Sequence, residues 1–236
     1  MKFLAILFFF LLLFSCQNKE KTKEEKLTIS NIKDHFYPYD TVPKIYVYRD
    51  VVGGLEEKFH RVYALQDQEG KHVIVEIYSS DFRIIEALNY DYSTLLYKDH
   101  MVVNRNKEKT KADLIKNKAF PSDDKSIAEF SSRFPGHLDS SLIIKEIKRK
   151  WNKNQVKTVN VLQKNLSVFS FYDQVTQTLL NPYTKKQAVI SSDQISNYGK
   201  GIGLIEWYSP NKKAHFRLEK ILDQKQWIEI TNKIKR

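Results

Sequence analysis

The chain has 236 residues, a single cysteine and a formal net charge of +11. Its hydrophobic content of 42% is ordinary for a globular protein. One cysteine excludes an internal disulfide, so the core has to supply the stability unaided. The length suits one sizeable domain or two small ones, and one domain is the simpler interpretation.

The first residues have the pattern of a secretion signal. Lys2 supplies a positive charge, residues 3–14 form an uninterrupted apolar run, and Ser15 is a small residue before a cleavage point. As a helix rising about 1.5 Å per residue, this run reaches roughly 18 Å, well short of the ~30 Å hydrocarbon core of a bilayer. Residues 1–15 are therefore predicted to be a cleaved signal peptide.

The end of this segment resembles the lipobox of bacterial lipoproteins in Leu13, Phe14, Ser15 and Cys16, with Phe14 in place of the usual small or branched residue. The resemblance implies diacylglycerol on the Cys16 thiol, cleavage before Cys16, and acylation of the new amino group with a chain such as palmitate. Several acyl chains anchor a protein durably. The alternative is an ordinary cleaved signal whose cysteine is incidental. Gln17 follows the cysteine, and by resemblance to lipoprotein sorting this favours the outer membrane, with the protein facing the periplasm or the exterior.

The segment after the cysteine is mostly charged or polar and lacks a core-forming period. Residues 16–34 are therefore predicted to be the lipidated cysteine and a solvated tether, and residues 35–236 a single β-rich domain. Asp40, Thr41 and Val42 resemble a short O-glycosylation motif of some envelope bacteria, which makes Thr41 a candidate glycosylation site just before the first strand.

Short β-rich segments begin after this point. Residues 44–51, 58–65, 72–78 and 83–90 predict an antiparallel meander, with Gly53 and Gly54 in the first hairpin turn because paired glycines accept positive φ.

Two helices are predicted next. Thr110 and Asp113 resemble a capping box ahead of Leu114 and Ile115. The second candidate lies between Pro121 and Pro135, starts near Ser122, and carries Ile127, Phe130 and Phe134 at helical spacing.

Strands resume in the second half, at residues 142–151, 156–162, 166–173, 175–180, 202–208 and 214–221. Asp223 is placed to cap a closing helix, with Gln226 three residues on. About ten strands and three short helices predict an α+β fold. We expect a large curved antiparallel sheet, an open half-barrel, with two or three short helices on or near its concave side and a C-terminal helix.

Residues 198–206, with Gly199, Gly201 and Gly203, resemble the "kGvGlvk" segment near the C-terminal hairpin of many bacterial envelope proteins. Several of these are similar to the lipoprotein carriers LolA and LolB, and the resemblance implies a half-barrel whose concave side can hold an acyl chain. The glycines themselves indicate a sharp corner or a close approach of another segment. They match no phosphate-binding motif.

No constellation of residues predicts catalysis, a metal or a cofactor. His137, Asp139, Ser140 and Ser141 carry the residue types of a triad, but adjacency provides neither convergence nor an oxyanion hole, so a loop is expected. His60 and His72 could face one another on neighbouring strands, yet they lack a carboxylate partner for a zinc site. Ligand-binding residues cannot be assigned from the sequence.

The positive charge gathers in residues 107–118, 145–157 and 212–220. An exported, membrane-anchored chain meets little nucleic acid, so a lysine-rich solvated surface is expected, with acidic polymers or lipid phosphates as the alternative partners. Three functions remain open. The favoured one is a non-enzymatic envelope lipoprotein that binds an apolar ligand such as a lipid or acyl chain. The others are an accessory lipoprotein that docks on another envelope protein, and a hydrolase whose site no motif reveals.

Overall fold

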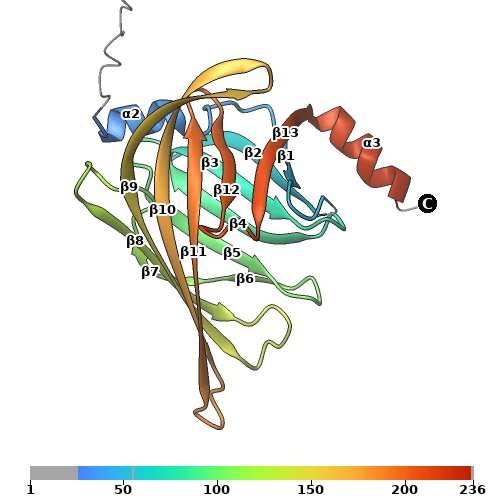
Figure 1. Ribbon diagram of the computed structural model, residues 1–236. Coiled ribbons are helices and arrows are strands. Elements are labelled where there is room, and N and C mark those ends of the chain that lie inside the picture. Colours follow the sequence, from blue (N-terminus) through green and yellow to red (C-terminus); the bar gives the residue numbers. More distant parts are fainter. Residues whose placement is uncertain (1–25, 55, 235–236) are drawn as a thin grey trace, which may run out of the picture.

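The computed structural model describes residues 26–54 and 56–234, and the predicted signal peptide and Cys16 lie outside them. Thirteen strands form one antiparallel sheet, accompanied by two helices in the described residues (Figure 1). The elements are α2 (Ile29–His35), β1 (Lys44–Asp50), β2 (Glu57–Asp67), β3 (Gly70–Tyr78), β4 (Ile84–Asp91), β5 (Tyr97–Val103), β6 (Lys109–Lys111), β7 (Asp113–Asn117), β8 (Ile127–Pro135), β9 (Ile143–Val161), β10 (Lys164–Leu180), β11 (Gln187–Gly199), β12 (Gly203–Tyr208), β13 (His215–Asp223) and α3 (Gln224–Ile234).

The sheet is strongly curved and nearly closes on itself. Its order is β6-β5-β4-β3-β2-β1-β13-β12-β11-β10-β9-β8-β7, so the two edge strands, β6 and β7, are consecutive in the chain. Ala112 links them and donates its backbone N–H to the His100 carbonyl over 2.8 Å. A bridge between Leu96 and Lys118 also joins the two ends of the sheet. The predicted α+β class and curved antiparallel sheet are confirmed, and the edges lie closer together than in the expected open half-barrel.

The first half follows the predicted meander. β1 pairs with β2, β2 with β3, and β3 with β4. Gly54 has a φ of 71° in the β1–β2 turn, a conformation that glycine adopts without steric cost. The first hairpin is therefore confirmed at the predicted glycines.

The two helices predicted between residues 110 and 134 are wrong, because this region forms β6, β7 and β8. In β8 Ala128, Phe130, Ser132 and Phe134 are buried at alternate positions, Ser131 between them is buried as well, and Ile127 is 58% exposed. Residues four apart share a face on a strand as well as on a helix, so the spacing of Phe130 and Phe134 fits both periods. The strand forms because it pairs with β9 along its whole length.

Four predicted strands merge into two long ones. Residues 142–151 and 156–162 both belong to β9, and residues 166–173 and 175–180 both belong to β10. β5 and β11 were not predicted. β11 was missed because it is polar, with Gln194, Ser196 and Asn197 in its second half. The last residues of this strand are nevertheless buried.

The helix α2 begins inside the segment predicted to be a tether. Thr28 caps it through its side chain, which accepts the Asn31 N–H at 3.2 Å. Leu27 and Ile32 are each 2% exposed and belong to the main apolar cluster. The packed part of the described chain therefore includes Leu27 and Ile32, which lie within residues 16–34.

The two helices lie on opposite faces of the sheet. Tyr46 and Tyr48 of β1 point into the interior, where the segment from α2 to Tyr37 packs, whereas Ile45 and Val47 point outward and pack with Trp227 of α3. Asp223 and Gln226 form the predicted reciprocal cap, with distances of 2.8 and 3.0 Å between backbone N–H and side-chain oxygen. Neither helix of the described residues has the length and apolarity needed to cross a membrane.

Candidate functional site: the interior of the curved sheet

The concave side of the sheet holds a cavity of about 410 Å³. Most of the surrounding interior is filled by aromatic side chains that contact one another edge to face or tilted, and burying each ring contributes on the order of 2 kcal/mol. The rings on the wall of the cavity are Phe36, Tyr37, Tyr90, Tyr97, Phe120, Phe130, Tyr198 and Trp207. The volume that remains is within the range of small-molecule pockets.

One wall of the cavity is charged rather than apolar. Every second residue of β9 faces inward, and the inward row contains Glu146, Lys148 and Lys150. Four lysines and two carboxylates line the cavity, and they are Lys58, Lys118, Lys148, Lys150, Glu86 and Asp173. The lining therefore carries more positive than negative charge, which favours an anionic group inside.

Lys148 lies between two carboxylates. Its Nζ is 2.8 Å from Glu146 Oε1 and 3.8 Å from Glu86 Oε1. Burial alone would lower the pKa of Lys148, but the two carboxylates outweigh it and raise the pKa above its usual value. Burial likewise would raise the pKa of Glu86, and Lys148 and His100 lower it to about 2. Both groups are therefore charged at neutral pH.

Lys150 forms a second charged group with β10 and β11. Its Nζ lies 2.5 Å from Asp173 Oδ1 and donates to Ser196 Oγ over 3.0 Å, and Ser196 Oγ donates to Asp173 Oδ2. Asp173 is directly opposite Lys150 in the β9–β10 register, so the pair follows from the strand pairing. The ammonium also lies 5.2 Å from the ring centroid of Tyr198, within cation–π range.

His60 lies at the border of the aromatic wall. Its Nδ1 is 3.1 Å from the Tyr37 hydroxyl, and its ring stacks on Trp207 at a centroid distance of 5.7 Å. Burial lowers the pKa of His60 to about 3, so the imidazole is neutral at pH 7.

A buried serine, histidine and carboxylate are connected beside the cavity. His100 Nδ1 is 3.0 Å from Ser132 Oγ, and His100 Nε2 is 3.0 Å from Glu86 Oε1. This is the connectivity of a nucleophilic triad. Ser132, however, is 0% exposed and does not line the cavity, so no substrate can reach its hydroxyl in this conformation. These contacts instead join β4 and β5, near one edge of the sheet, to β8, near the other edge.

The glycine-rich segment has a packing role. Gly203 has a φ of 102°, and a Cβ at this position would lie 2.4 Å from Cδ1 of Tyr37. Gly201, with a φ of 74°, donates its N–H to the Asp34 carbonyl over 2.8 Å. The predicted close approach is thus confirmed, and it lets the segment after α2 pack against the β11–β12 hairpin.

The sequence-based candidates lie away from this cavity, except for His60. The Asp139 carboxylate accepts the backbone N–H and the hydroxyl of Ser141, which confirms a turn with Ser140 inside it. His60 and His72 lie on neighbouring strands but do not face one another, because His60 is opposite Ile77 and His72 is opposite Leu65.

Two further observations concern the other predicted sites. Within residues 26–54 and 56–234, no three His, Cys, Asp or Glu residues are grouped as metal ligands would be. Thr41 is exposed just before β1, and its glycosylation stays a prediction.

The charged wall was missed because its residues look solvent-exposed in the sequence. The stretch Lys145–Lys150 reads as a basic surface, yet its even-numbered residues face the interior. The outward row pairs Trp151 with Tyr172 in a stack at 4.6 Å. In the sequence, Trp151 in the same alternating row as Lys145 and Arg149 was the signal that this row, and not the row with Lys148 and Lys150, faces outward.

Comparisons with known proteins add little to this geometry. No family model matches the chain, and no curated protein matches it. Among solved structures, it is similar to a proposed lipoprotein from Parabacteroides distasonis, with 12% identity, a TM-score of 0.49, and coverage of 80% of this chain and 98% of the other. A proposed exported protein with a YmcC-like fold from Bacteroides fragilis also aligns, with 12% identity, a TM-score of 0.43, and coverage of 80% and 99%. Both likenesses are too distant to transfer a function.

Proposed function

We propose that this protein is a non-enzymatic, lipid-anchored lipoprotein of the cell envelope whose interior binds an amphipathic ligand with an acidic group, such as a fatty acid. The observation that carries the proposal is the cavity of about 410 Å³, in which Lys148 and Lys150 face a wall of aromatic rings. The rings suit an apolar chain, and the excess of lysines suits a carboxylate or phosphate at one end of it.

The aromatic filling limits the size of the ligand. A half-barrel that carries a whole multi-acyl lipid needs an open concave face, whereas here Phe36 and Phe120 occupy much of it. The proposed ligand is therefore a single short or medium acyl chain. The resemblance to LolA and LolB supports the kind of ligand, and it stays a prediction.

The membrane anchor is proposed from the lipobox. Cys16 carries the acyl groups, and the outer membrane is the proposed destination because Gln17 follows the cysteine. Labelled palmitate should be incorporated into the chain in growing bacteria, and the Cys16→Ala variant should incorporate none. Equal labelling of the unchanged protein and the Cys16→Ala variant would refute the anchor and would leave the proposal for the cavity unaffected.

Binding to the cavity can be followed through Trp207, which lines it. The variant Trp151→Phe/Trp227→Phe leaves Trp207 as the sole tryptophan. With the mature chain in phosphatidylcholine vesicles, decanoate should change the emission of Trp207 and bind at least ten-fold more tightly than decanol, which lacks the charge.

Two variants test the position of the ligand. Val175→Phe adds volume inside the cavity, and Lys148→Met removes a charge from it, so each should weaken decanoate binding at least ten-fold. Lys164→Met, in the exposed β9–β10 turn, is the matched control and should bind as before. Unchanged binding by Val175→Phe, in a chain with normal circular dichroism, would refute the proposal.

A second candidate function, docking on another envelope protein, has an observation of its own. β10 and β11 extend beyond the rest of the sheet as a long hairpin (Figure 1). β12 pairs with β11 only at Ile195–Gly199, so within the described part of the chain Gln187–Gln194 form a free edge of β11. Val189 and Ile190 on this edge are more than half exposed. Free edges and exposed apolar residues accept partner strands. Photo-crosslinking from position 189 in intact cells would capture such a partner.

A further inference from the structure

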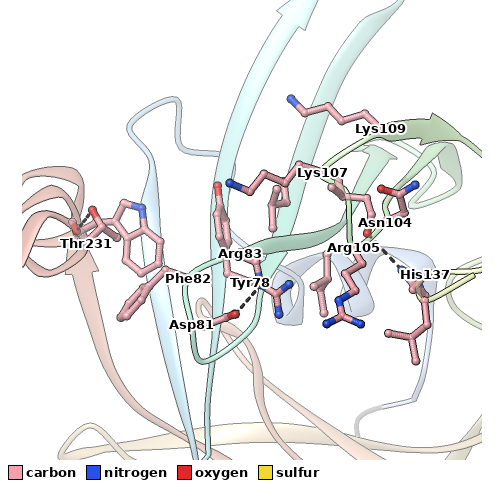
Figure 2. Close-up of a pocket in the computed structure, with 15 residues that line it drawn as sticks. Tyr78, Asp81, Phe82, Arg83, Asn104, Arg105, Lys107, Lys109, His137 and Thr231 are labelled. Carbon is pink, nitrogen blue, oxygen red and sulfur yellow. Dashed lines mark hydrogen bonds and ion pairs between the residues drawn. The ribbon is translucent and has the colours of Figure 1, made fainter. Parts of the chain in front are cut away.

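A groove of about 950 Å³ lies outside the sheet, beside α3. Three turns and the helix form it: the β3–β4 turn with Arg83, the β5–β6 turn with Arg105 and Lys107, the β8–β9 turn with His137, and α3 with Trp227. Figure 2 shows Phe82 and Thr231 on one side and Arg105, Lys109 and His137 across from them. Ile85 lines both this groove and the aromatic cavity, and the other lining residues of the groove are its own.

One wall of the groove is aromatic and firmly held. Trp227 is buried against Tyr78 and Phe82, each at a centroid distance of 5.3 Å, and also contacts Phe59 at 5.2 Å. Across the groove Leu138 is 85% exposed, an unusual position for a large apolar side chain. The groove thus has apolar surface that water solvates poorly.

The rim of the groove is cationic. Four basic side chains, Arg83, Arg105, Lys107 and Lys109, line it together with a single carboxylate, Asp81, which pairs with Arg83. In the described part of the chain, Arg105, Lys107 and Lys109 have no ion pair. The nearby Glu108 carboxylate accepts the Asn104 side-chain amide over 2.6 Å. The rim therefore carries an excess of three positive charges.

The turns that carry these cations are held together by backbone contacts. Arg105 donates its N–H to the His137 carbonyl over 2.9 Å, and His137 Nδ1 is 3.3 Å from the Val103 carbonyl. Asn104 accepts the backbone N–H groups of Lys107 and Glu108, each over 3.0 Å. Because the backbone of the turn is fixed, bringing its charges to one ligand orders only the side chains.

From this combination we propose that the groove binds a phosphate-bearing amphiphile. The phosphate lies among Arg105, Lys107 and Lys109, and Arg83 extends the cationic rim toward the aromatic wall. The apolar part of the ligand packs on Phe82 and Trp227. Guanidinium and ammonium groups together suit a phosphate with two negative charges. The groove shares only Ile85 with the lining of the interior cavity, and the proposal does not depend on the function proposed for that cavity.

Trp227 reports on the groove as Trp207 reports on the cavity. In the variant Trp151→Phe/Trp207→Phe, Trp227 is the sole tryptophan. With the mature chain in phosphatidylcholine vesicles, dihexanoyl phosphatidic acid below its micelle concentration should change Trp227 emission and bind at least ten-fold more tightly than dihexanoyl phosphatidylcholine or inorganic phosphate. Raising the salt concentration should weaken this binding.

Substitutions locate the phosphate. Arg105→Gln/Lys107→Gln should weaken binding of the phosphatidic acid at least ten-fold, and both side chains are exposed, so the fold should persist. Lys212→Gln/Lys213→Gln removes the same charge from the exposed β12–β13 turn and should bind as before. If inorganic phosphate bound as tightly as the phosphatidic acid, the proposed contribution of the apolar wall would be refuted. If phosphatidylcholine bound as tightly, the proposed contribution of the cationic rim would be refuted. An unchanged Trp227 spectrum would refute binding in the groove.

Discussion

The interior of this sheet has two halves that are stabilised in different ways. The half lined by β1–β3 and the segment after α2 is packed with rings and apolar side chains such as Phe36, Tyr48 and Val73. The half formed by β9–β11 contains ion pairs such as Lys150 with Asp173, next to unfilled volume. Packed rings resist unfolding without directing what binds, whereas buried charges contribute little net stability and select a ligand. The comparison teaches that the charges of β9–β11, unlike the packed rings, are not explained by the hydrophobic effect.

The largest expected effect comes from breaking an ion pair in the charged half. Lys150→Met leaves the Asp173 carboxylate, which is 6% exposed, without its cation, and should lower the free energy of unfolding by about 3 kcal/mol. The double variant Lys150→Met/Asp173→Leu should recover most of the loss, because it removes the uncompensated charge as well. Chemical denaturation measures both, and a double variant no more stable than the single one would contradict this account.

A smaller effect is expected in the packed half. Gly203→Ala places a methyl group against the Tyr37 ring at a positive φ, and should lower the free energy of unfolding by about 2 kcal/mol. Gly54→Ala, where a Cβ meets nothing within 4 Å, is the matched control for positive φ alone and should cost about 1 kcal/mol. Equal losses at the two positions would show that the contact with Tyr37 is unimportant.

The smallest effect concerns His60, at the border between the two halves. Its pKa is about 3 in the folded chain, below its value near 6.5 when unfolded, so the unfolded chain binds the proton more readily. Stability is therefore complete above pH 6.5 and falls as the pH drops toward 3, by about 1 kcal/mol at pH 5.5. Denaturation at pH 7.5 and 5.5 should show this loss, and His60→Gln should show less of it.

The sequence predicted the packed half better than the charged one. Alternation and paired glycines located β1–β4, and the reciprocal pair of Asp223 and Gln226 located the start of α3. β8 was predicted as a helix because Phe130 and Phe134 satisfy both periods, and only pairing with β9 decides between them. β11 was missed because its polar residues, such as Gln194 and Ser196, hide the alternation of a strand.

The site was beyond sequence reasoning for a related physical reason. Lys148 and Lys150 are inward-facing only because Phe130 of β8 and Asp173 of β10 lie beside them in the register, and no local pattern encodes that register. Glu86 meets His100 and Lys148 because the sheet closes. A basic stretch in an isolated sequence is normally on the surface, and here closure of the sheet reverses that rule.

The pairing of β1 with β13 determines when the sheet can be completed during folding. Lys44 lies opposite Asp223, and Asp50 opposite Phe216, so the first strand has no complete set of partners until the last one has been delivered. Such distant contacts make folding slow, since a long loop must close before either strand gains hydrogen bonds. A chain threaded across a membrane from its amino end would therefore remain extended during transport, and would fold only after its final strand arrived.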